Sequence, residues 1–182
     1  MPQPSTGTGG RCAGLARIPA AANSGAMHST RVSRHVNAPR AAVYRALLDA
    51  DAVAAWRTPD DMTARVHAFD AREGGTFRVT LTYDAATGTG KSGARTDTYH
   101  GHFARLVPDE RVVEVLEFES ADPAFAGTMT MTTTLADVSG GTDVTVVHEG
   151  LPDAVPAADN ETGTRMALAK LAALVEAAGR PG

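Results

Sequence analysis

Apolar and polar side chains alternate with a period of two along most of the chain between residues 63 and 148. The run from Thr76 to Tyr83 is the clearest case, because Phe77, Val79 and Leu81 alternate with polar residues. Such alternation is typical of a strand with one face toward the core and the other toward water. Turn-rich pieces separate the runs, at the spacing of consecutive antiparallel hairpins. The pattern predicts strands at 63–69, 76–83, 98–106, 111–118, 128–135 and 143–148.

Helical spacing appears before this region. A weakly alternating strand is expected at 30–36, and apolar residues then recur on one stripe of a helix. Asn37 is a suitable N-cap for that helix, and Pro39 suits its first turn because the missing N–H would have no partner there. Asp49 or Asp51 is expected to cap a second short helix.

The longest helical pattern lies near the end of the chain, in ETGTRMALAKLAALVEAAG (161–179). Leu168 and Leu171 fall on its apolar stripe, and Gly179 followed by Pro181 is the usual order at a helix end. The elements therefore run as strand, two short helices, six strands and a long helix. This order predicts an α+β domain with one curved antiparallel sheet wrapped around the C-terminal helix.

Residues 1–27 differ in composition from the rest of the chain. They are rich in Gly, Pro, Ser, Thr and Ala and poor in large apolar side chains, so they cannot bury enough surface to offset the entropy cost of ordering. We expect a disordered leader there and one domain over 28–180, which the length of 182 residues favours. The sequence leaves two alternatives for the first residue of the native chain, Met1 and Met27.

Charge and cysteine content exclude several classes of partner. The formal net charge is -4, and neither sign forms a long block, so we expect neither nucleic acid nor an anionic membrane surface as a partner. The single cysteine, Cys12, rules out an intrachain disulfide and fits a reducing compartment. No apolar run reaches the roughly 18 residues of a membrane span. These observations predict a cytoplasmic protein.

Five pieces of the chain stand in an informative order: RHVNAPRAAVYRALLDADAVAAW, FDAREGGTFRV, YHGHFARLVPDERVV, GGTDVTVVHEGLP and ETGTRMALAKLAALVE. Together they resemble the activator of heat-shock-chaperone ATPase homologue-like family of the START-like (SRPBCC) superfamily. The resemblance implies a helix-grip fold, in which about seven antiparallel strands curl around the C-terminal helix and leave an apolar cavity. Gly74 and Gly75 would form the turn between the second and third strands, where a positive φ is tolerated without a side chain. Asp70 and Arg72, which flank this turn, are expected to pair.

Position and alternation predict which residues line such a cavity. Ligand cavities are mostly apolar with a few placed polar groups, although each of these residues singly is also typical of plain core. Many relatives have Gly-Trp where this chain has Gly163 and Thr164, which predicts a wider or differently shaped entrance. We expect ligand contacts from Trp56, Tyr83, Tyr99, Phe103, Glu117, Met129, Met131, His148, Thr164 and Leu168.

Glu117 and His148 are weak candidates for proton transfer. Glu114 and Glu117 lie on opposite faces of the strand at 111–118, so one of them enters a cavity if only one face is inner, and burial would raise its pKa. The favoured interpretation is that both glutamates reach water. His100 and His102 share one strand face, but the other ligands of a zinc site are not apparent, and nothing indicates a metal or another cofactor.

Three functions follow from these features. The leading one is binding of a small apolar or amphipathic ligand between the sheet and the last helix. One alternative is a cyclase, dehydratase or hydrolase that uses polar cavity residues. Another, which the family resemblance implies, is docking on a heat-shock chaperone in a stress response. A homodimer formed through edge strands is also compatible with the pattern.

Overall fold

The structure is a computed structural model that describes residues 28–85, 90–93 and 95–179. The expected leader therefore lies outside the described residues. Within the described ranges there are three α-helices and one short 3-10 helix: α1 (Arg40–Leu47), α2 (Ala50–Arg57), η1 (Pro123–Phe125) and α3 (Ala157–Ala178). Its strands are β1 (His28–Val36), β2 (Met62–Phe69), β3 (Thr76–Tyr83), β4 (Thr96–Val107), β5 (Arg111–Phe118), β6 (Met129–Val138) and β7 (Gly141–Leu151).

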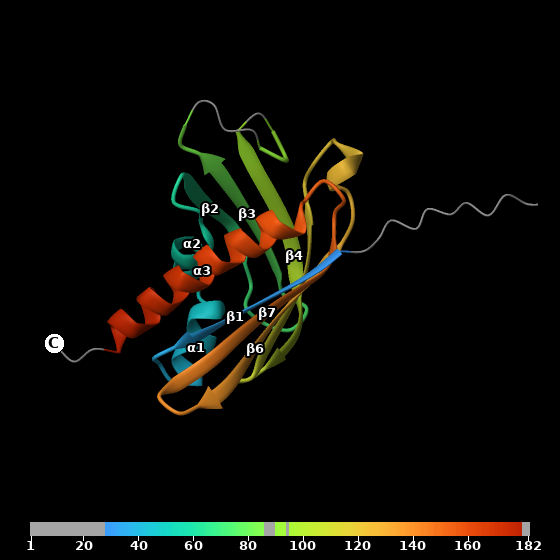
Figure 1. Cartoon of the computed structure of the whole chain (residues 1–182). Coiled ribbons are helices and arrows are strands. Elements are labelled where there is room, and N and C mark those ends of the chain that lie inside the picture. Colours follow the sequence, from blue (N-terminus) through green and yellow to red (C-terminus); the bar gives the residue numbers. More distant parts are fainter. Residues whose placement is uncertain (1–27, 86–89, 94, 180–182) are drawn as a thin grey trace, which may run out of the picture.

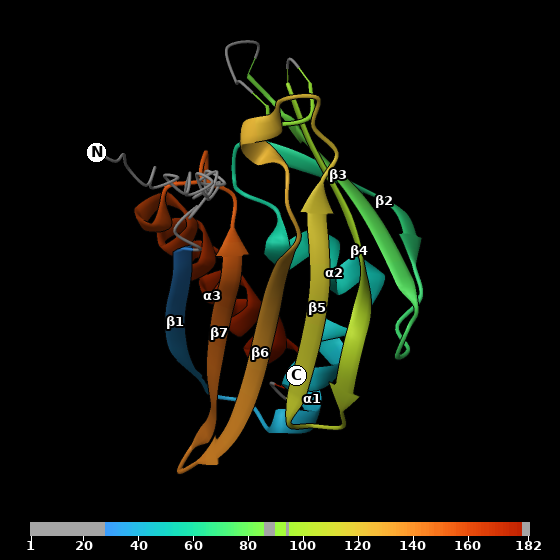
Figure 2. The same cartoon turned by 90° about the vertical axis from the view of Figure 1, so that its right-hand side faces the viewer.

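All seven strands belong to one antiparallel sheet, in the order β1-β7-β6-β5-β4-β3-β2. Strands β2 to β7 are neighbours in sequence order, whereas β1 pairs with β7 at the far edge. The sheet curves around α3, and all three α-helices lie on its concave side (Figures 1 and 2). This is the helix-grip fold that the sequence predicts. In the described part of the chain, no helix is both long and apolar enough to cross a bilayer.

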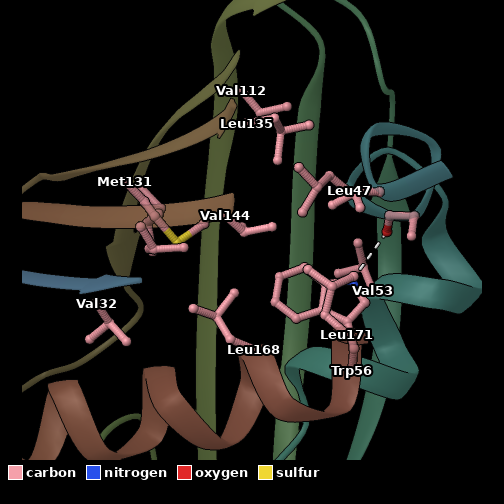
Figure 3. Close-up of a cluster of buried hydrophobic side chains, with 14 of the residues drawn as sticks. Val32, Leu47, Val53, Trp56, Val112, Met131, Leu135, Val144, Leu168 and Leu171 are labelled. Atoms are coloured by element: carbon pink, nitrogen blue, oxygen red, sulfur yellow. Dashed lines mark hydrogen bonds between the residues drawn. The ribbon is translucent and has the colours of Figure 1, made fainter. Parts of the chain in front are cut away.

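The core forms where one stripe of α3 meets the concave face of the sheet. Leu168 and Leu171 of α3 are almost completely buried, at 1% and 0% exposure, and lie among side chains from the sheet and α2 (Figure 3). Trp56 of α2 is part of the same cluster, and its indole N–H donates a hydrogen bond to the backbone carbonyl of Ala46 at 3.1 Å. Burial of side chains of this size supplies most of the free energy that holds α3 against the sheet.

The turn between β2 and β3 needs its two glycines for different reasons. Gly74 has a φ of 77°, a conformation that side chains disfavour. Gly75 has no positive φ, but a Cβ there would lie 2.1 Å from the carbonyl oxygen of Asp70. The expected Asp70–Arg72 pair is present, with Arg72 Nε 2.7 Å from an Asp70 carboxylate oxygen.

The predicted cap of α1 is wrong. Pro39, in an extended conformation, occupies the N-cap position, and no side chain caps this helix. The chain first bends after β1, so α1 begins too late for Asn37 to reach its free N–H groups. Asn37 instead donates from its backbone and its side-chain amide to Glu176 Oε1, at 2.8 and 3.0 Å. For α2, Asp49 is the cap, because its carboxylate accepts from Ala52 N–H at 2.8 Å.

Candidate functional site

A pocket of about 530 Å³ lies between the concave face of the sheet and the first half of α3. Residues of β2 to β7, the end of α2, η1 and the segment before α3 complete its wall. Small residues, among them Gly163 and Ala167, form part of the helix side, which leaves room that larger side chains would fill. The space between sheet and helix is therefore not completely occupied by the protein's own side chains.

Eight of the ten predicted ligand contacts line this pocket: Trp56, Tyr83, Tyr99, Met129, Met131, His148, Thr164 and Leu168. Phe103 does not. It is fully buried in the core, where its ring makes edge-to-face contacts with Phe69 and Phe77 at centroid distances of 5.5 and 5.3 Å. Alternation identifies Phe103 correctly as an inward residue, but it does not distinguish a pocket wall from solid core.

The two glutamates of β5 occupy opposite faces of the sheet. Glu117, the predicted candidate for proton transfer, points away from the pocket, and its side chain is 47% exposed and pairs with His100 Nε2 at 2.9 Å. Glu114 is the inward residue and is only 3% exposed. The expectation that both glutamates reach water is therefore wrong. The burial of Val112 and Leu116, which share the parity of Glu114, fixes which face is inner.

Arg57 is the partner that makes the burial of Glu114 possible. Its Nη1 and Nη2 atoms donate to the two carboxylate oxygens of Glu114 at 3.0 and 2.9 Å. Burial lowers the pKa of Arg57, but the charge and hydrogen bonds of Glu114, together with a smaller effect of Tyr99, outweigh it, so the net pKa shift is upward and the guanidinium stays charged. The guanidinium also lies 4.9 Å from the ring centroid of Trp56, a cation–π contact.

The end of α2 is held where Arg57 can reach this partner. Lys170 of α3 donates to the backbone carbonyl of Thr58, the residue after Arg57, at 2.6 Å, and pairs with Asp60 at 2.7 Å. The long helix thus anchors the segment that carries Arg57. Sequence reasoning missed this residue, because an arginine at the end of a short helix is usually solvated.

Two polar atoms in the pocket wall have no hydrogen-bond partner among the described residues. They are the Tyr99 hydroxyl and Arg57 Nε, and both are buried. The charge of Arg57, and then a side-chain contact at hydrogen-bond range, act to lower the pKa of Tyr99, although this contact does not meet the distance and angle of a hydrogen bond. Burial raises the pKa of Tyr99 against the opposing charge of Arg57, so its hydroxyl remains protonated at neutral pH. Both atoms are therefore donors.

His148 of β7 is also buried in the pocket wall, at 8% exposure. Its Nδ1 lies 3.4 Å from Thr30 Oγ1, and the Thr30 hydroxyl donates to Asn160 Oδ1 at 2.6 Å. Since Thr30 uses its only proton on Asn160, it can only accept from His148, which places the imidazole proton on Nδ1 and leaves Nε2 as an acceptor. Burial, and then the charge of Arg57, lower the pKa of His148 to about 4, so the ring is neutral at pH 7.

A second ion pair stands in the pocket wall. Lys91 Nζ lies 2.5 Å from a carboxylate oxygen of Asp97, and the lysine is 5.4 Å from the ring centroid of Phe118. Asp97 is almost fully buried, so this carboxylate, like that of Glu114, is neutralised by a cation. Among all the described residues, no group of three or more His, Cys, Asp or Glu side chains is placed to hold a metal ion.

A larger hollow, of about 1010 Å³, lies at the other end of α3 against α1 and α2. Alanines and exposed charged residues such as Asp49 and Asp51 line it. Within the described part of the chain, none of its lining side chains carries a buried polar atom without a partner. The pocket between the sheet and α3 is therefore the stronger candidate site.

Comparison with family models identifies the chain. The model described as Activator of Hsp90 ATPase homolog 1-like protein matches residues 37–176, which include every wall of the pocket. The chain belongs to this family. Comparison with curated proteins gave no match.

Several solved structures have the same fold. A protein from Chromobacterium violaceum is 35% identical, with a TM-score of 0.72, over 81% of this chain and 96% of that one. A protein from Rhodobacter sphaeroides is 23% identical, with a TM-score of 0.66, over 81% and 93%. An Activator of Hsp90 ATPase homolog 1-like protein from Aeromonas hydrophila is 21% identical, with a TM-score of 0.62, over 84% and 94%.

Proposed function

We propose that this protein binds a small apolar or amphipathic molecule in the pocket between the sheet and α3. The observation that carries the proposal is a space of about 530 Å³ in the place where a solid core would otherwise form. Most of its wall is apolar, with Met129, Met131 and Leu168 among the contacts, while a few polar groups are fixed within it. This combination is typical of small-molecule sites.

The placement of the acidic groups favours binding over catalysis. Glu117 faces away from the pocket, and Glu114 is held on both oxygens by Arg57, so neither is free to transfer a proton to a bound molecule. His148 has an acceptor nitrogen, but its lowered pKa makes it a weak base at neutral pH. The site therefore supports recognition better than general acid–base chemistry.

Docking on a heat-shock chaperone, which the family description suggests, is a separate proposal. It would use an outer surface of the domain and leave the pocket free. Copurification of the chaperone with a variant whose pocket is blocked would favour docking as an independent role.

Two threonines of α3 offer a matched test of ligand binding. Thr164 lines the pocket, whereas Thr162 is exposed, and both hydroxyls donate to the carbonyl four residues earlier. Binding of tetralin, an uncharged bicyclic hydrocarbon, can be followed by the indole N–H resonance of Trp56, the single tryptophan. We expect Thr164→Phe to weaken tetralin binding about tenfold, or about 1.4 kcal/mol, and Thr162→Phe to leave it unchanged. Absence of a saturable shift in the unmodified protein would contradict the proposal.

A further inference from the structure

We propose that the ligand presents an uncharged hydrogen-bond acceptor, such as a ketone oxygen, to the Tyr99 hydroxyl and Arg57 Nε. This inference rests on the proposed function and specifies the chemistry of the molecule in the same pocket. It concerns two polar groups of the pocket wall, near each other, for which no described residue supplies a partner with the distance and angle of a hydrogen bond.

Unpartnered donors of this kind need a physical explanation. Native structures satisfy the large majority of buried side-chain polar atoms, because a buried donor loses its hydrogen bonds to water and gains nothing in return. Of the three buried side-chain atoms without a hydrogen bond of full geometry in the described chain, two line this pocket, and the third, His100 Nδ1 on the outer face, lies 3.3 Å from a carboxylate oxygen of Glu119. An acceptor supplied from within the pocket would satisfy both of the first two.

The two donors act in one region of the pocket. Arg57, Tyr99 and His148 all line the same pocket, and the side chains of Arg57 and Tyr99 are in contact near hydrogen-bond range. The Nη atoms of Arg57 donate to Glu114, and its Nε has no hydrogen-bond partner among the residues that the structure describes. A carbonyl oxygen has two lone pairs and can accept from two donors at once.

The charges around the pocket favour an uncharged acceptor over a carboxylate. Arg57 is already neutralised by Glu114, and the partly buried Lys91 by Asp97, so each of these two cations in the wall has its own buried anion. A ligand carboxylate at Tyr99 would come close to Glu114 without a free positive charge to compensate it. A charge buried without a partner is far more costly than a neutral dipole.

Three related probes separate this inference from the function on which it rests. They are tetralin, its ketone 2-tetralone, and the carboxylate 1,2,3,4-tetrahydronaphthalene-2-carboxylate, each titrated while the Trp56 indole N–H resonance is recorded. The variants are Tyr99→Phe, which removes only the hydroxyl, and Tyr44→Phe as a control outside the pocket. We expect Tyr99→Phe to weaken 2-tetralone binding about fivefold, the effect of one neutral hydrogen bond, and to leave tetralin binding and the Tyr44→Phe control unchanged.

Each of the other outcomes would refute either the acceptor proposal, the argument from paired charges or the proposed function. If tetralin binds but Tyr99→Phe does not change 2-tetralone binding, the acceptor proposal fails while the pocket remains a binding site. If the carboxylate binds more tightly than the ketone and loses affinity in Tyr99→Phe, the ligand is anionic and the argument from paired charges is wrong. If neither tetralin nor 2-tetralone binds, the proposed function itself fails.

Discussion

Arg57, at the end of α2, and Glu114, in the middle of β5, form a two-pronged ion pair on the concave side of the sheet, with N–O distances of 3.0 and 2.9 Å. The two residues are 57 positions apart in sequence. Their pairing joins the helical layer to the sheet and places a charged but compensated group in an otherwise apolar wall. It also leaves the pocket with hydrogen-bond donors and no net charge from this pair.

Glu114→Gln should destabilise the fold strongly, because it leaves the buried charge of Arg57 without its anion. Removing one partner of a buried ion pair typically costs about 3 to 5 kcal/mol. Glu117→Gln is the matched control on the same strand, and its half-exposed position predicts a change within about 0.5 kcal/mol. Urea unfolding of both variants measures the difference. Equal free energies of unfolding for the two variants would contradict the claim that the buried charge of Arg57 needs Glu114.

Tyr99→Phe should stabilise the ligand-free protein. The Tyr99 hydroxyl is buried without a partner among the described residues, so its removal relieves a desolvation cost and leaves the ring in place. We expect a gain of about 1 kcal/mol in the free energy of unfolding. A loss of stability in urea unfolding of ligand-free protein would show that the hydroxyl has a partner within the fold.

His148 should make stability depend on pH between about 6.5 and 4. Its pKa is lower in the folded state, so in this range the unfolded chain binds a proton that the folded chain does not. The stabilisation is complete above pH 6.5 and is lost as pH falls toward 4, by about 3 kcal/mol for a shift of this size.

The variant His148→Gln tests this dependence directly, because it removes the titrating ring. As the pH falls, the free energy of unfolding of His148→Gln should decrease less than that of the unmodified protein. His67→Gln, at an exposed position of β2, should show the same decrease as the unmodified protein. Parallel pH curves for the unmodified protein and His148→Gln would refute the assignment.

Replacing Gly163 by alanine should raise the free energy of unfolding but weaken ligand binding. It lies inside α3, where glycine is less favourable than alanine by about 0.5 to 1 kcal/mol, and a Cβ there would meet no atom within 4 Å. Because Gly163 lines the pocket, Gly163→Ala should stabilise the protein and weaken tetralin binding. Gly101→Ala is the contrasting variant, since its Cβ would lie 2.1 Å from the Val115 carbonyl oxygen and should destabilise the protein by about 3 kcal/mol.

Most of the fold could be predicted from local pattern. The strand predicted at Thr76–Tyr83 matches β3, and the strand predicted at Arg111–Phe118 matches β5, because their alternation is strict. The pairing of β1 with β7 was not predicted, since no local signal in the sequence joins segments so far apart and the family resemblance implied only a single sheet of about seven strands. The start of α1 was missed because the bend after β1, rather than the nearest capping residue, decides where that helix begins.

The site was less predictable than the fold, for a physical reason. Alternation gives the direction of a side chain, so it placed Tyr99 and His148 inward, but whether an inward residue faces a pocket depends on how α3 sits above the sheet. The large apolar side chains Leu116 and Phe118 share the parity of Glu114 and could have identified it as the inner glutamate. Arg57 had no such signal, because its role depends on a partner in another element.

The most direct test of the account is native mass spectrometry of the protein purified from its own host, compared with the same sample after denaturation. We expect a stoichiometric additional mass that disappears on denaturation and that belongs to an uncharged molecule with a carbonyl or similar acceptor. A ligand-free mass from the native host, together with no tetralin binding by the purified protein, would contradict the claim that the pocket between the sheet and α3 is a ligand site.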